Sequence, residues 1–102
     1  MEIYTNFNGN VLYLCLHGEI DEHSASLVRR EADLLAERYA GCIRVIFDLK
    51  NVTFMDSTGI GFLIGRYKKF KRHGIPGYVT NATPETDKIL SMSGIYSLMP
   101  RV

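Results

Sequence analysis

The pattern of apolar and polar positions predicts strands that alternate with helices along the chain. Ile3, Thr5 and Phe7 alternate with polar residues, which is typical of a short strand with one covered face. Asn8-Gly9 follows and favours a hairpin turn, because both residues tolerate a positive φ. The apolar run at 11–16 therefore predicts a second strand, antiparallel to the first and inside the sheet.

The next segment has the period of an amphipathic helix. Asp21 to Ser24 provide several candidate N-terminal caps, and the helical pattern continues to about Tyr39. Arg29 and Asp33 stand one turn apart and can pair across the solvated face, which adds only a few tenths of a kcal/mol. The apolar positions share one face at spacings of four, three and four: Val28, Ala32, Leu35 and Tyr39.

The segment from 43 to 70 changes from a strand pattern to a helix pattern. Ile43 to Leu49 is almost continuously apolar, which predicts a strand covered on both faces. Between this strand and the helix stands Asp56-Ser57-Thr58-Gly59, a helix-start signal whose side chains can accept bonds from unpaired backbone N–H groups. The helix that follows has one apolar stripe: Ile60, Leu63, Ile64, Tyr67 and Phe70.

The last third of the chain predicts one more strand and one more helix. Cations suit the end of the preceding helix, where they complement the helix dipole: Arg66, Lys68, Lys69, Lys71 and Arg72. A short strand is predicted at 77–81. Thr83-Pro84-Glu85 opens a helix that Gly94 ends, and residues 95–99 form a final short strand or tail.

This order of elements predicts one α/β domain. The sheet is expected to be mixed, with four or five strands, antiparallel in its first hairpin and parallel afterwards, and packed against helices. Parallel strands end at the same edge of a sheet, where ligands and partners of open α/β sheets gather. We therefore expect residues 21–24 and 56–58 to be neighbours, together with Thr80 and Asn81.

Composition narrows the class of protein without identifying it. The 102 residues carry a net charge of +1, which indicates no bias toward nucleic acid or an anionic membrane. No apolar run reaches the ~20 residues that span a bilayer, and the first residues lack a signal-peptide pattern, so a cytoplasmic protein is predicted. Cys15 and Cys42 lie in or beside apolar strands and are interpreted as reduced, small hydrophobic residues.

Ser57 is the strongest candidate for chemistry. A hydroxyl at a helix start is exposed, and the positive end of the helix dipole favours an added phosphate there. The alternative is that Ser57 only caps the helix, worth ~1 kcal/mol. Gly59 and Gly61 lower helix stability by roughly 0.5–1 kcal/mol each. Their presence is explained either by close approach of another molecule or by tight packing of the helix on the sheet.

Catalytic and metal sites are disfavoured. No Gly-x-Gly-x-x-Gly loop, phosphate-binding loop or nucleophile elbow is present, and no spacing suits a metal site, so neither cofactor nor metal is predicted. His23 is a conceivable base for Ser57 across the end of the sheet. A hydrolase is nevertheless disfavoured, because nothing supplies an oxyanion hole or a substrate pocket.

Three segments resemble the STAS-domain anti-sigma factor antagonists of bacteria, most of all the sporulation type. The resemblance lies in Asp48-Leu49-x-x-Val52-x-Phe54-Met55-Asp56-Ser57-Thr58-Gly59, in Gly18-Glu19-Ile20-Asp21, and in Asn81-Ala82-Thr83-Pro84 with Ser93-Gly94-Ile95. It implies a STAS domain over 1–102 that binds an anti-sigma factor which is also a serine kinase. That kinase would phosphorylate Ser57 with ATP and end the complex, and a PP2C-like serine phosphatase would restore it.

The resemblance also implies a partner-binding surface around Ser57. The residues assigned to it are Asp21, His23, Ser24, Asp56, Ser57, Thr58, Gly59 and Ile60. The protein itself is expected to be a monomer and not an enzyme. Three alternatives stay open: a stress-response antagonist, a passive interaction domain, and a nucleotide-binding or hydrolytic domain.

Overall fold

Four strands and three helices follow one another in the computed structural model, which describes all 102 residues. The strands are β1 (Glu2–Asn8), β2 (Val11–Ile20), β3 (Arg44–Met55) and β4 (Gly77–Thr80). The helices are α1 (Glu22–Arg38), α2 (Ser57–Lys71) and α3 (Pro84–Ser93), followed by a short 3₁₀ helix, η1 (Ile95–Ser97). None of the helices combines the length and apolar character needed to span a membrane.

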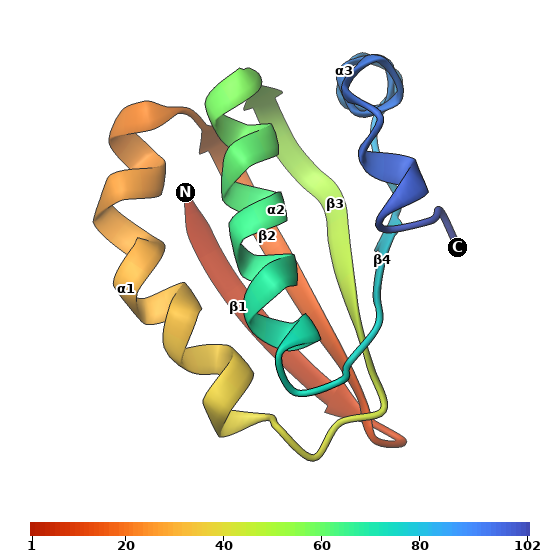
Figure 1. The fold of residues 1–102 in the computed structure, drawn as a ribbon. Coiled ribbons are helices and arrows are strands. Elements are labelled where there is room, and N and C mark those ends of the chain that lie inside the picture. Colours follow the sequence, from red (N-terminus) through yellow and green to blue (C-terminus); the bar gives the residue numbers. More distant parts are fainter.

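The four strands form one mixed sheet in the order β1-β2-β3-β4 (Figure 1). β1 and β2 are antiparallel, whereas β2, β3 and β4 run parallel to one another. Right-handed crossovers between successive parallel strands place both connecting helices on the same face. The mixed α/β sheet predicted from the sequence is thus confirmed, with four strands.

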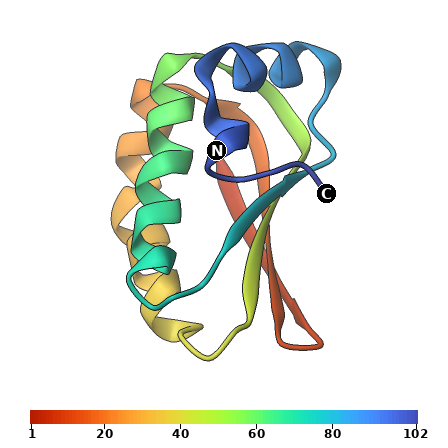
Figure 2. The ribbon, with the colours of Figure 1, turned by 45° about the vertical axis from the view of Figure 1, so that its right-hand side comes forward.

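Only one face of the sheet is covered by helices, and α1 and α2 lie side by side on it (Figure 2). Val45, Phe47 and Leu49 point into this core and are fully buried, whereas on the other face Ile46 is 4% exposed and Asp48 is half-buried. The prediction that residues 43–49 form a strand covered on both faces therefore holds at Ile46 and fails at the rest of the segment, because no helix covers the second face. Ile43 precedes β3 and is 61% exposed, and β3 continues to Met55.

The first hairpin turns one residue later than predicted. Asn8 pairs with Val11 in the ladder, so the two turn residues are Gly9 and Asn10. Both have a positive φ, 60° and 62°, as a tight hairpin turn of the mirror-image type requires.

An ion pair between buried Arg66 and half-buried Asp33 joins α1 to α2, in place of the predicted pair of Arg29 with Asp33. Arg66 Nε lies 2.8 Å from Asp33 Oδ1, and the Arg66 guanidinium stacks over the ring of Phe62. Arg66 is only 6% exposed, so it does not belong with the solvated cations at the end of α2. Its burial lowers the pKa of the guanidinium, although the charge of Asp33 acts in the opposite direction.

The C-terminal part confirms the predicted helix, whereas residues 95–99, for which a short strand or a tail is predicted, contain no strand. Thr83 caps α3 through the Thr86 N–H, Pro84 occupies the first turn, and Gly94 ends the helix with φ 79°. Residues 95–97 then form η1 instead of a strand. Beyond η1, Arg101 makes one isolated bridge to Val79 of β4.

Both cysteines are free, as predicted from their apolar surroundings. Cys42 is buried and Cys15 is half-buried on the uncovered face of the sheet. Burial raises the pKa of both thiols, which keeps them in the less reactive protonated form.

Candidate functional site

The carboxyl ends of β2 and β3 lie side by side at one end of the sheet, where α1 and α2 both begin (Figure 1). Ile20 and Met55 are paired in the parallel ladder, so the residues directly after them are neighbours. The expected proximity of 21–24 and 56–58 is thereby confirmed. They border an open hollow of about 570 Å³, lined by Asp21, Glu22, His23, Ser26 and Asp56.

Asp56, and not Ser57, caps helix α2. Asp56 Oδ1 accepts hydrogen bonds from the N–H groups of Thr58 at 2.9 Å and Gly59 at 3.2 Å. Ser57 is the first residue of the helix and is exposed. Its hydroxyl therefore stands at the positive end of the helix dipole without a capping role.

Asp21 holds the start of α1 in the same way. Its carboxylate accepts from the Ser24 N–H at 2.9 Å, while the Asp21 N–H donates to Ser24 Oγ at 3.0 Å, which completes a capping box. The hydrogen bond from the Ser24 backbone lowers the pKa of the Asp21 carboxyl. Asp21 is therefore ionised at neutral pH and adds negative charge beside Ser57.

The eight residues assigned to the partner surface differ in their exposure. Ser57 and His23 are exposed, and Asp21, Asp56 and Thr58 are half-buried. The remaining three are buried and shape the site from below: Ser24, Gly59 and Ile60. Partner contact stays a prediction for all eight. No set of three or more His, Cys, Asp or Glu side chains is placed to hold a metal ion.

The two glycines of the first turn of α2 have different surroundings. A methyl group at Gly59 would lie 2.5 Å from Met55 Cγ and 3.0 Å from the Ile20 carbonyl oxygen, so tight packing on the sheet explains this glycine. Gly61 is exposed and has nothing within 4 Å of its Cβ position. Close approach of another molecule thus stays open only for Gly61.

Replacing these glycines by Ala should change stability in opposite directions. Gly59→Ala is expected to lower the free energy of unfolding by about 1–3 kcal/mol, because the Ile20 carbonyl cannot move cheaply. Gly61→Ala is expected to raise it by up to ~1 kcal/mol, since Ala favours the helix and meets no neighbour. Urea denaturation of both variants measures the difference, and equal effects would contradict the assigned packing.

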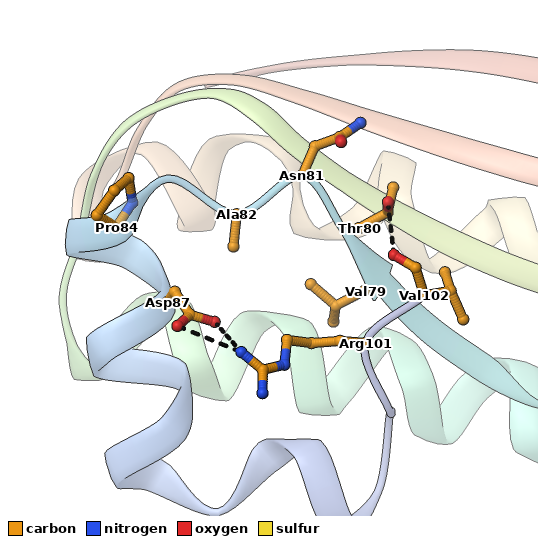
Figure 3. A pocket seen from close by; sticks show the side chains of 8 residues that line it. All are labelled: Val79, Thr80, Asn81, Ala82, Pro84, Asp87, Arg101 and Val102. Atoms are coloured by element: carbon orange, nitrogen blue, oxygen red, sulfur yellow. Dashed lines mark hydrogen bonds and ion pairs between the residues drawn. The ribbon is translucent and has the colours of Figure 1, made fainter.

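The expectation that Thr80 and Asn81 share this site is wrong. β4 pairs with β3 only as far as Asp48, and Met55 lies about 20 Å further along the strand. The Asn81 amide donates instead to the Asp48 carboxylate at 3.3 Å. Both residues line a separate hollow of about 410 Å³ that is closed on one side by the Asp87–Arg101 ion pair (Figure 3).

One residue near the site was missed from the sequence. Phe54 lies three residues before Ser57 on β3 and is 50% exposed, as open as Tyr4 and Phe7 on β1. The apolar pattern places the end of the strand at Leu49, which assigns Phe54 to a loop. The only signal was its position in the segment that resembles the antagonist family.

Comparison with known proteins supports the fold and the family resemblance of the segment around Ser57. The STAS domain family model matches residues 2–102, and the chain belongs to this family. A protein named anti-sigma F factor antagonist from Paenibacillus polymyxa is 35% identical over 98% of this chain and 85% of its own length. An anti-sigma-B factor antagonist from Bacillus subtilis (strain 168) is 32% identical over 90% of this chain and 82% of its own.

Solved structures of SpoIIAA share the fold. The anti-sigma factor antagonist SpoIIAA in its unphosphorylated form has a TM-score of 0.78 at 21% identity, covering 99% of this chain and 88% of that one. The phosphorylated form from Bacillus has a TM-score of 0.71 at 20% identity, covering 99% and 91%. At this level of identity the two structures establish the architecture alone.

Proposed function

We propose that the protein is an anti-sigma factor antagonist that acts in the cytoplasm. In its unmodified form it binds an anti-sigma factor that is also a serine kinase, and the bound sigma factor is released. Two relatives named anti-sigma factor antagonists support this proposal, because each matches this chain over most of both sequences. We favour the sporulation type over the stress-response type, because the match to the anti-sigma F relative is longer and higher in identity.

Ser57 is the residue that the kinase modifies. The observation that carries this assignment is that Ser57 is exposed at the first position of α2 while Asp56 supplies the cap. Phosphorylation therefore removes no capping bond. The helix dipole favours the new charge by roughly 0.3–1 kcal/mol, so the fold is retained.

The phosphate switches the surface by charge and by size. It adds about −1.5 to −2 charge at neutral pH. Asp56 is adjacent in the chain, and the carboxylates of Asp21 and Glu22 line the neighbouring hollow. A partner surface that accepts a neutral hydroxyl then meets a bulky anion within an acidic cluster, which weakens the complex. A PP2C-like serine phosphatase reverses the change.

Incubation with the cognate kinase and ATP tests the assignment. The intact mass of the wild-type protein is expected to rise by one phosphate. Ser57→Ala should abolish the rise because it removes the acceptor hydroxyl. Thr58→Ala is the matched control, since it removes the adjacent hydroxyl and should leave the rise unchanged. A phosphate that remains on the Ser57→Ala protein would contradict the proposal.

A further inference from the structure

Residues 100–102, which we call the strap, lie along the outer edge of β4 and pair with it. The Val79 N–H donates to the Pro100 carbonyl at 3.0 Å, and the Val102 N–H donates to the Val79 carbonyl at 2.9 Å. The Thr80 hydroxyl donates to the Val102 carbonyl at 3.1 Å (Figure 3). Because β4 is the last strand of the sheet, the strap satisfies backbone groups that β4 would otherwise present to another chain.

A cluster of three side chains fastens the strap to helix α3. Arg101 Nη1 lies 3.2 Å from Asp87 Oδ1 of α3, and the Arg101 guanidinium lies 4.8 Å from the ring centre of Tyr96 in η1. The Tyr96 hydroxyl donates to the same Asp87 oxygen at 2.5 Å. Burial and this hydrogen bond raise the pKa of Tyr96, so the phenol stays protonated and keeps donating at neutral pH.

The strap is nevertheless held more weakly than the residues before it. The Arg101 side chain is 63% exposed, and an ion pair in contact with water contributes little to stability. Met99 directly precedes the strap and is fully buried, whereas all three strap residues are exposed. Segments with few buried contacts open far more often than the whole fold unfolds. Opening of the strap therefore ends at Met99 and uncovers the edge of β4 while the core stays folded.

We propose that the strap prevents two copies of this chain from pairing through their β4 edges. The bonds to Val79 show that this edge has room for an extended chain and pairs with one. An edge that is open on one copy is open on every copy, and two identical strands can pair across a twofold axis. The β4 edge of a second copy therefore replaces a strap that has opened. This inference concerns a surface away from Ser57 and does not depend on the proposed function.

Removing one backbone donor from the strap tests the proposal. Val102→Pro lacks the N–H that bonds to the Val79 carbonyl, and it leaves the net charge unchanged. Amide exchange at Val79 should become at least about 5-fold faster, which corresponds to the loss of one hydrogen bond. Val102→Ala is the matched control because it keeps the N–H and shortens a side chain that is 62% exposed. Its exchange should stay within about 2-fold of the wild type.

Sedimentation over a range of protein concentrations then measures self-association. The Val102→Pro protein is expected to form dimers, whereas the wild-type and Val102→Ala proteins stay monomeric. In the dimer, exchange at Val79 should slow again as the concentration rises, because the second copy takes the place of the strap. A Val102→Pro protein that stays monomeric, or one that dimerises without this slowing, overturns the proposal.

Arg101→Ala tests the same proposal through the side chain. Thermal unfolding shows whether Val102→Pro folds, and if it does not, Arg101→Ala carries the test. Exchange at Val79 should become about 2-fold faster, because a partly exposed ion pair is lost, and dimers should form at higher concentration than for Val102→Pro. Arg30→Ala is the matched control, since Arg30 is exposed on α1. Equal behaviour of the two arginine variants, or a wild-type protein that already dimerises through β4, overturns the inference.

Discussion

Replacing Ser57 with Glu is expected to weaken binding to the cognate anti-sigma factor kinase by ~100-fold or more. The side chain at this position is exposed at the start of α2, so it meets the partner directly in the proposed complex. The new carboxylate would be desolvated beside Asp56 and close to Asp21. Calorimetric or surface-based titration of the purified proteins measures the loss of affinity.

Two further substitutions at the same position separate charge from size. Ser57→Gln has nearly the shape of Glu without its charge, so it should bind more tightly than Ser57→Glu if electrostatics dominate. Ser57→Ala should bind about as well as the wild type, because the proposed complex requires no hydrogen bond from the Ser57 hydroxyl. A Glu variant that binds as firmly as the wild type would refute the switch.

The second large effect is expected at the ion pair between α1 and α2. Asp33→Ala should lower the free energy of unfolding by about 3 kcal/mol, because it leaves the Arg66 charge buried and unpaired. The Arg66 side chain is 8% exposed, and its Nη1 already lacks a hydrogen-bond partner. The 2.8 Å contact to Asp33 also lacks hydrogen-bond geometry, so little else compensates the burial of the charge.

The double variant Asp33→Ala/Arg66→Met is the informative control. Removing both charges and keeping an apolar side chain of similar length should recover most of the lost stability, since a buried ion pair is often no better than apolar packing. Thermal unfolding reports both changes, at about 4–8 °C per kcal/mol for a domain of this size. A double variant as unstable as Asp33→Ala would show that the cost lies elsewhere.

The contrast between the two halves of β3 shows what could be predicted from the sequence. Val45, Phe47 and Leu49 alternate regularly and mark the first half as a strand. In the second half the ladder with β2 has two register shifts, each with an extra residue on β3. An extra residue reverses which side chains face the core. The period of two is therefore lost after Leu49, and the strand is hidden in what looks like a loop.

The parts of the site that depend on the order of the parallel strands could be predicted. The choice between two neighbouring residues that can both cap α2 could not. Parallel strands bring the residues after β2 and β3 together, and Asp21 and Asp56 are indeed neighbours. Asp56 and Ser57 are both good caps, and only the backbone geometry selects Asp56. The burial of Arg66 left no signal, because a charged residue in a helix end usually faces solvent. Asn81 was misplaced because β4 is much shorter than β3.

The affinity of the fully phosphorylated protein for its anti-sigma factor tests the central claim most directly. The unmodified protein and the same preparation phosphorylated on Ser57 are titrated side by side, before and after treatment with a serine phosphatase. We expect phosphorylation to weaken binding ~100-fold or more and phosphatase treatment to restore it. Equal affinity of the two forms would contradict the account.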